Sequence, residues 1–156
     1  MKKITLVFII SLFITSCNQE KDNTSQIRGL VTEKAMVVSA RIEASKIGTE
    51  ILKKGGNAFD AMMATELALA VAYPYAGNIG GGGFMVYRKK DGEIGALDYR
   101  EKAPLAATRD MYLDKEGNII KGKSTVGATA VGVPGTVAGV FKAQEKFGVL
   151  SVKEIL

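Results

Sequence analysis

Residues 58–72 (AFDAMMATELALAVA) constrain the fold more than any other part of the sequence, because they are apolar almost all the way round a helix. Only Asp60, Thr65 and Glu66 are polar, so the segment has no continuous polar face to turn toward water. A membrane-spanning helix needs about 20 apolar residues, and this segment is shorter and carries two acids. We therefore predict a buried structural helix, whose many alanines allow another layer to pack closely.

The segments around this helix alternate between helical and strand patterns. Asn57 is the predicted N-cap of the buried helix, with Asp60 in its first turn. Asp91-Gly92 is a two-residue turn signal between strand-like runs and predicts an antiparallel hairpin. The other expected elements are a β-prone run at 36–40, a helix at 41–54 with Ile42, Ile47 and Ile51 on one face, strands at 84–89 and 94–99, a helix-capable stretch at 108–113 and a helix at 137–147. Helices beside antiparallel strands favour an α+β fold.

The first 16 residues are predicted to be a signal peptide. Lys2 and Lys3 precede an apolar stretch at 4–14, which is too short to span a bilayer. Small residues then precede Cys17, and this pattern resembles the lipobox of bacterial lipoproteins. The resemblance implies cleavage before Cys17, a lipid on its thiol and anchoring in the cell envelope. Residues 17–35 are then the lipidated cysteine and a polar tether. An ordinary secretory signal with an incidental cysteine is the alternative.

Composition narrows the chemistry that the chain can perform. Cys17 is the single cysteine and there is no histidine, so an intrachain disulfide, a His-based nucleophile pair and a His-based metal site are excluded. The acids show no metal-ligand spacing, and we expect neither metal nor cofactor. Once the signal peptide is removed, the chain is mildly basic, without a Lys/Arg cluster of the kind that binds nucleic acid.

Four successive glycines, Gly80, Gly81, Gly82 and Gly83, stand between the buried helix and the first strand. A dinucleotide-binding fingerprint needs a strand before the glycines and a helix after them, and here that order is reversed. The glycines therefore indicate a close approach of backbone, either to another part of the protein or to a ligand.

The segment Gly117–Ser124 matches the phosphate-binding pattern GxxxxGK[ST] in full. That pattern requires a buried strand before it and a helix directly after it. The preceding residues 114–116 are charged, and small residues interrupt the segment that follows, so a chance match explains the pattern. Nucleotide binding remains an alternative at this point.

Arg100 follows the second predicted strand in the sequence Asp98-Tyr99-Arg100-Glu101. One interpretation is a surface ion pair with Asp98 or Glu101, which would contribute little. The other is a guanidinium directed at a ligand carboxylate, because the planar fork of arginine can bind both carboxylate oxygens at once.

Four collinear stretches together resemble the N-terminal part of the large subunit in the gamma-glutamyltransferase (glutathione hydrolase) family. The resemblance runs from about Val37 to the last residue. The stretches are ILKKGGNA with Asp60-Ala61, PYAGNIGGGGF at 74–84, LDYRE at 97–101 with Ala103-Pro104, and VPGTVAG at 133–139.

This resemblance implies a partial αββα sandwich of the N-terminal-nucleophile hydrolase type over residues 36–156, with the glycines allowing its layers to approach closely. It implies that a precursor cleaves itself and that the new N-terminal Thr of the small subunit attacks glutathione or a related γ-glutamyl compound. Arg100 would bind the α-carboxylate of that donor. No catalytic residue of this scheme lies in the present chain, so we expect the 156 residues alone to be inactive.

A non-catalytic envelope lipoprotein that uses this segment as a binding module is the main rival interpretation. An open reading frame that continues from Leu156 to the Thr motif would favour the enzyme, and a stop codon would favour the module.

Overall fold

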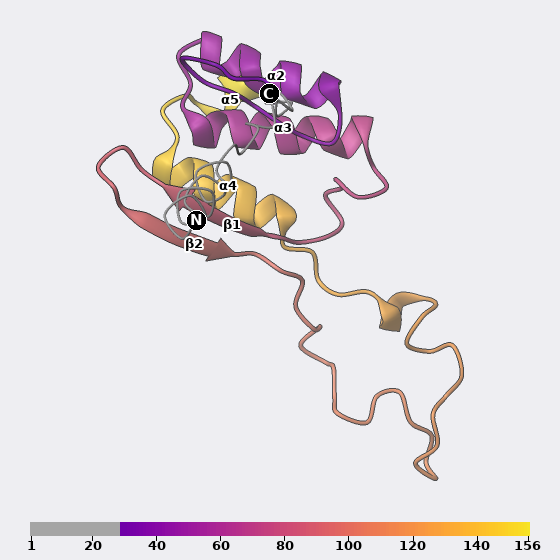
Figure 1. The fold of residues 1–156 in the computed structure, drawn as a ribbon. Helices are drawn as coiled ribbons and strands as arrows, with labels where there is room; N and C mark the ends of the chain where they lie inside the picture. The colour runs from indigo at the N-terminus through magenta and orange to yellow at the C-terminus, as the bar shows by residue number, and fades with distance from the viewer. Residues whose placement is uncertain (1–28) are drawn as a thin grey trace, which may run out of the picture. The chain divides into compact units, whose positions relative to one another are not determined.

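The computed structural model describes residues 29–156; the predicted signal peptide, Cys17 and most of the predicted tether lie outside the described residues. The chain divides into two units, Met1–Glu33 and Lys34–Leu156. In the first unit, the described residues 29–33 contain no helix or strand. The elements of the second unit, drawn in Figure 1, are α2 (Ile42–Lys53), α3 (Ala58–Ala72), β1 (Phe84–Arg88), β2 (Ile94–Asp98), the short 3₁₀ helix η1 (Ala128–Ala130), α4 (Thr136–Phe147) and α5 (Val152–Ile155).

Helix α3 begins where the sequence predicts, because Asn57 and Asp60 form a capping box. The Asn57 side chain accepts hydrogen bonds from the backbone N–H groups of Phe59 and Asp60, at 2.8 and 3.1 Å. The Asp60 carboxylate accepts one from the backbone N–H of Asn57, at 2.9 Å. These bonds satisfy donors that a helix start otherwise leaves without partners.

Asp60 also connects the start of α3 to the segment that follows α4. Its carboxylate is completely buried and accepts from the backbone N–H groups of Val149 and Leu150, at 3.1 and 3.4 Å. The Asn57 amide donates to the carbonyl of Phe147 at 2.6 Å. The start of α3 is therefore bonded to the connection between α4 and α5.

Helix α2 packs on α3 through a face different from the predicted one. Its buried residues are Ala44, Gly48 and Ile51, whereas Ile42 and Ile47 are exposed. The prediction of a shared isoleucine face was wrong because the five residues from Ile42 to Ile47 advance a helix by about 1.4 turns.

The hydrophobic core lies where α3 meets α2, α4 and α5. It consists of Ile51, Ala61, Met63, Ala64, Val140 and Ile155. Burial within α3 is concentrated in its first half, and Val71 near the other end is 84% exposed. The prediction of a helix buried along its whole length is therefore correct only for its N-terminal half.

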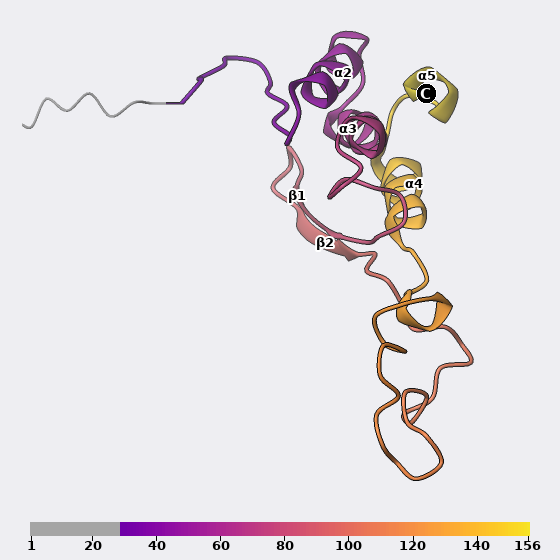
Figure 2. The same cartoon turned by 90° about the vertical axis from the view of Figure 1, so that its right-hand side faces the viewer.

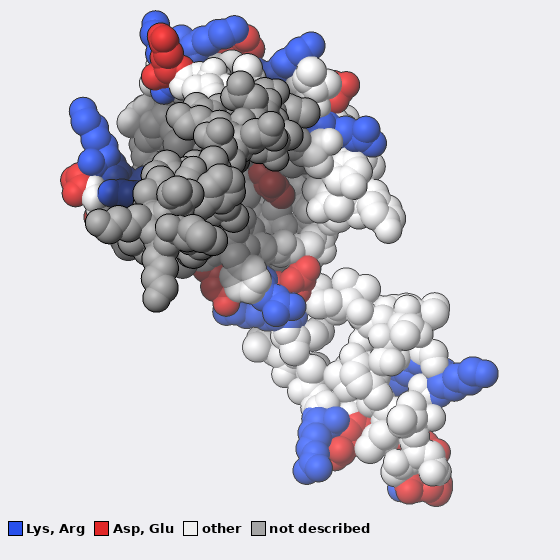
Figure 3. All heavy atoms as spheres, viewed as in Figure 1, with Lys and Arg blue, Asp and Glu red and all other residues white. Residues whose placement is uncertain are grey.

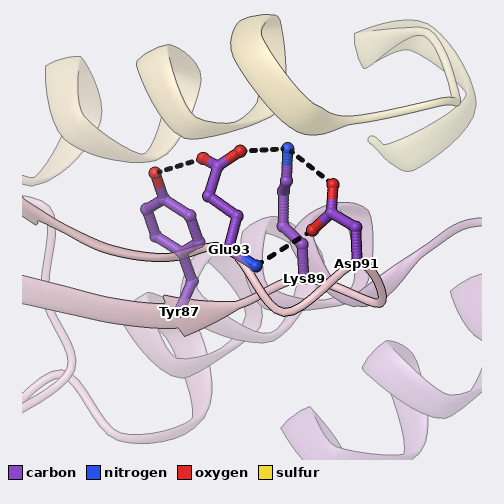
Figure 4. A network of polar contacts seen from close by, with 4 residues as sticks. All are labelled: Tyr87, Lys89, Asp91 and Glu93. Carbon is purple, nitrogen blue, oxygen red and sulfur yellow. Dashed lines mark hydrogen bonds and ion pairs between the residues drawn. The ribbon is translucent and has the colours of Figure 1, made fainter.

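Strands β1 and β2 form an antiparallel hairpin in which Phe84 pairs with Asp98 and Arg88 with Ile94. The connecting turn has three residues rather than the predicted two, because the N–H of Lys89 donates to the carbonyl of Glu93 at 2.8 Å. Gly92 takes a left-handed conformation there, with φ of 92°. Lys89 bridges Glu93 and Asp91 at 2.6 and 3.6 Å across the turn, and Tyr87 donates to Glu93 (Figure 4).

The two faces of the hairpin have different surroundings. Met85 is buried, and the Tyr87 ring lies 5.7 Å from Phe59 and 4.8 Å from Phe147, so this face packs on the helices. The opposite face carries exposed apolar side chains, among them Val86 and Ile94. Figure 2 shows the hairpin beside the helical layer.

The connection from β2 to α4 contains no α-helix, although one was expected at 108–113. The carbonyl of Tyr112 instead accepts a hydrogen bond from the N–H of Ile120, at 2.9 Å, and Leu113 bridges to Ile119. The predicted strand at 36–40 is also absent, because no described segment pairs with it. No helix in the described residues is long and apolar enough to cross a membrane. The mixture of helices and a hairpin agrees with the predicted α+β class.

Candidate substrate-binding site

The candidate site begins at the end of β2, where Asp98 turns the chain into Arg100. The Asp98 Oδ1 atom accepts a hydrogen bond from the backbone N–H of Arg100 at 3.0 Å. A short aspartate side chain commonly binds the backbone two residues further on in this way. Asp98 therefore contacts the main chain of Arg100 rather than its guanidinium.

The Arg100 side chain is exposed, and its guanidinium makes no ion pair within residues 29–156. The ion pair with Asp98 or Glu101 that the surface interpretation requires is thus missing there. The guanidinium carbon lies 5.7 Å from the centre of the Phe84 ring, within the range of a cation–π contact. A charged, donor-rich group remains available to a ligand at the end of the hairpin.

Glycines from two distant segments lie against the backbone around Arg100. A Cβ atom added to Gly82 would come within 2.7 Å of the Arg100 Cα, the Glu101 nitrogen and the Tyr99 carbonyl oxygen. A Cβ on Gly135 would collide with the backbone of Tyr99 and Arg100, and one on Gly139 would collide with the Tyr99 side chain.

Only part of the predicted glycine run makes these close approaches. A Cβ on Gly83 would meet the Tyr99 ring at 2.8 Å, whereas the nearest atom to one on Gly80 or Gly81 is a side-chain oxygen at 3.3 or 3.4 Å. In the described residues, the partner of this close approach is the protein's own backbone and Tyr99.

The start of α4 is bonded to the same region. The carbonyl of Gly81 accepts hydrogen bonds from the N–H groups of Gly135 and Thr136, at 2.9 and 3.1 Å. Lys102 and Val133 exchange two backbone hydrogen bonds, at 3.1 and 2.8 Å. These bonds join three segments that are distant in the sequence.

A groove of about 560 Å³ lies between the strand end and α4. Its charged lining residues are Asp98, Arg100, Glu101, Lys102 and Lys142. Lys142 pairs with Glu145 at 2.8 Å, so Arg100 and Lys102 are the cations of this lining that lack an ion pair within the described residues. The lining thus carries charges of both signs, and within it the planar guanidinium of Arg100 is the group that suits a ligand carboxylate. On the face drawn in Figure 3, basic and acidic side chains lie close together in several places.

A second groove, of about 530 Å³, lies between the segment 35–38 and helices α2 and α3. Glu66 is one of its lining residues, and burial raises the pKa of this carboxyl. Burial also raises the pKa of Tyr99, with a smaller contribution from the negative charge of Glu66. The lining is otherwise mainly apolar, and it contains no second charged side chain.

Neither a metal centre nor a phosphate loop is formed in the described residues. They contain no group of three or more His, Cys, Asp or Glu side chains that could hold a metal ion. Gly117–Ser124 contains the isolated bridge of Ile119 to Leu113 followed by turns, and the three-residue η1 lies downstream in place of a phosphate-binding helix. This geometry does not support the nucleotide-binding alternative.

Sequence reasoning singled out Arg100 and Gly80–Gly83, and the structure places Gly82 of this run against the Arg100 backbone and Gly83 against Tyr99; Cys17 lies outside the described residues. It missed the contacts of Gly135, Gly139 and Phe84 with this region. The spacing of Gly135 and Gly139, one helical turn apart, was the available signal for a close helix contact.

Fold and site together define an α+β segment that presents an unpaired arginine at the end of a hairpin. The sequence profile of the Gamma-glutamyltranspeptidase family matches residues 44–156. The chain therefore belongs to the gamma-glutamyltranspeptidase family.

Individual relatives agree with this assignment. The chain is 60% identical over 124 residues to a glutathione hydrolase proenzyme of Pseudomonas sp. (strain A14), covering 80% of this chain and 22% of the relative. It resembles the crystal structure of Helicobacter pylori gamma-glutamyltranspeptidase with a TM-score of 0.77 and 48% identity, covering 82% of this chain and 37% of the other. A second solved structure is gamma-glutamyltranspeptidase from Pseudomonas nitroreducens complexed with L-DON. It matches with a TM-score of 0.74 and 51% identity, covering 80% of this chain and 37% of the other. The chain thus spans about a fifth of the length of its curated relatives.

Proposed function

We propose that this chain is the N-terminal part of a gamma-glutamyltranspeptidase precursor and that Arg100 binds the α-carboxylate of a γ-glutamyl donor such as glutathione. The observation that carries this proposal is the exposed guanidinium, which has no ion pair in the described residues and belongs to the LDYRE stretch. A carboxylate can accept two parallel N–H bonds from such a group. The groove beside it offers space for a small amino-acid ligand.

The reaction would be an acyl transfer at a nucleophile that the precursor supplies from its small subunit. The hydroxyl of the new N-terminal Thr attacks the γ-carbonyl, and its own α-amine accepts the proton. The peptide amine leaves with a proton, and water or an amino acid then takes the γ-glutamyl group from the threonine. Because the 156 residues contain no such N-terminal Thr, the chain alone is expected to be inactive. Release of γ-glutamyl groups by the purified chain would refute this.

The complete domain would be an αββα sandwich, and the hairpin supports that arrangement. Helices cover one face of β1 and β2, whereas Val86 and Ile94 on the other face are 80% and 73% exposed. An exposed apolar sheet face is the kind of surface that a second sheet covers. In the full-length protein we expect Val86→Asp to lower the unfolding temperature by several degrees, and an unchanged temperature would count against the second sheet.

Cys17 would carry a lipid that anchors the protein in the bacterial cell envelope. The support for this is the lipobox-like sequence before Cys17. Cells fed a labelled fatty acid should incorporate the label into the native protein but not into Cys17→Ser. Labelling of both proteins, or of neither, would refute the anchor.

The role of Arg100 is tested by Arg100→Lys in the full-length protein. Lysine keeps the charge but loses the paired bonds, and one hydrogen bond to a charged group contributes about 1.5–3 kcal/mol. We therefore expect the donor KM to rise by roughly 10- to 100-fold while the acceptor KM is unchanged. Arg88→Lys is the matched control, because Arg88 lies at the far end of the same hairpin. Equal loss of donor and acceptor binding would contradict the assignment.

A further inference from the structure

We propose that Phe84 and Asp98 are positioning residues that hold Arg100 in the orientation its ligand requires. This inference rests on the proposed function of Arg100. Phe84 and Asp98 face each other in the register of the hairpin, in its last pair before the glycines and Arg100. One contacts the side chain of Arg100 and the other its main chain.

Asp98 fixes where the Arg100 side chain starts. Its Oδ1 atom accepts the Arg100 N–H at 3.0 Å, which turns the chain directly after β2. The Gly82 backbone lies close to that of Arg100, because a Cβ atom at position 82 would come within 2.7 Å of the Arg100 Cα atom. The interaction that the Asp98 carboxylate makes is thus this hydrogen bond to the main chain, since the carboxylate makes no ion pair within residues 29–156.

Phe84 restricts where the side chain ends. Its ring centre lies 5.7 Å from the guanidinium carbon, although the Phe84 side chain itself is 64% exposed. A free arginine side chain samples many rotamers, and ordering it on binding costs affinity. An aromatic ring beside the guanidinium reduces that cost before the ligand arrives.

The two interactions are chemically compatible. A cation–π contact uses the face of the guanidinium, whereas a carboxylate binds the N–H groups in its plane. Phe84 can thus remain in contact with Arg100 while a donor carboxylate is bound. The ring would add to donor affinity without touching the donor.

The test compares Phe84→Leu with Phe84→Tyr in the full-length protein. A cation–π contact at an exposed site corresponds to an affinity change of about two- to fivefold, so Phe84→Leu should raise the donor KM by that factor. Phe84→Tyr keeps the ring and should retain the native donor KM, with the acceptor KM unchanged in both. Val86→Ala is the control, because Val86 lies on the same face of the same strand.

Asp98 is tested by Asp98→Ala and Asp98→Asn. The asparagine keeps an oxygen that can accept the Arg100 N–H, so it should preserve the donor KM while the alanine raises it. A matching loss in both variants would show that the negative charge matters, not the hydrogen bond, and would overturn this part of the inference.

Measuring Phe84→Leu in a protein that already carries Arg100→Ala distinguishes positioning of Arg100 from general destabilisation. In an Arg100→Ala protein, Phe84→Leu should have no further effect on the donor KM, because the group that it positions is gone. Equal effects in both backgrounds would overturn the inference. If Arg100→Ala itself leaves the donor KM unchanged, the proposed function fails; if only Phe84→Leu has no effect, the positioning inference fails alone.

Discussion

Replacing Gly82 by alanine should destabilise the protein and weaken donor binding together. Neither Gly82 nor Gly80 has a positive φ, so the backbone conformation of both positions is open to alanine. The difference between them is steric. A Cβ on Gly82 meets three backbone atoms of Tyr99, Arg100 and Glu101 at 2.7 Å, whereas a Cβ on Gly80 meets only the side-chain oxygen of Asn78, at 3.3 Å.

The expected magnitudes follow from these contacts. Forcing an extra methyl group into a packed site costs about 1–3 kcal/mol. Any Gly→Ala change at a position with a compatible backbone conformation also stabilises the protein by about 0.4–1 kcal/mol, because it lowers the entropy of the unfolded chain. Gly82→Ala should thus lose about 1–2 kcal/mol of stability, and Gly80→Ala should be neutral or slightly stabilised.

The assay is thermal unfolding of the full-length variants, with the donor KM measured on the same samples. Because the colliding atoms include the Cα of Arg100, Gly82→Ala should also raise the donor KM, and Gly80→Ala should leave it unchanged. Equal stability of the two variants would refute the conclusion that backbone contact, rather than backbone conformation, requires glycine at position 82.

Three further predictions concern other parts of the fold. Asp60→Ala should cost about 3 kcal/mol or more in chemical unfolding, because it leaves three N–H donors without an acceptor, and Asp60→Asn should cost less. Gly92→Ala should cost about 1–2 kcal/mol in the same assay, since residue 92 has φ of 92°. Burial raises the pKa of Glu66, so its contribution to stability is fully present at acidic pH and is lost as pH rises through the raised pKa. Glu66→Gln should therefore raise the unfolding temperature at neutral pH and not at acidic pH, and an equal gain at both would contradict this.

Local signals in the sequence predicted those parts of the fold that local interactions determine. Asn57 and Asp60 gave the start of α3 because a capping box involves residues only three apart. Asp91-Gly92 located the hairpin, although the turn uses three residues and positive φ at Gly92. The β-prone run at 36–40 forms no strand for a non-local reason. A strand forms only where a partner strand pairs with it, and the run itself carries no information about that partner.

Contacts between distant segments were beyond the reach of pattern reasoning. The sequence places Arg100 next to two acids, and an ion pair with one of them was a reasonable alternative. Which group Asp98 binds depends on the bend after β2. Likewise, Gly135 and Gly139 are more than 30 residues from Tyr99, so only the folded chain reveals why they lack side chains.

The most direct test of the central claim removes each partner of the contact between Arg100 and the donor α-carboxylate, first separately and then together. The donor and an analogue that lacks only its α-carboxylate are compared in the native full-length protein and in Arg100→Ala. If Arg100 binds that carboxylate, its removal should weaken native binding by roughly 10- to 100-fold and should have little further effect in the variant. An equal penalty for the analogue in both proteins would show that another group binds the carboxylate.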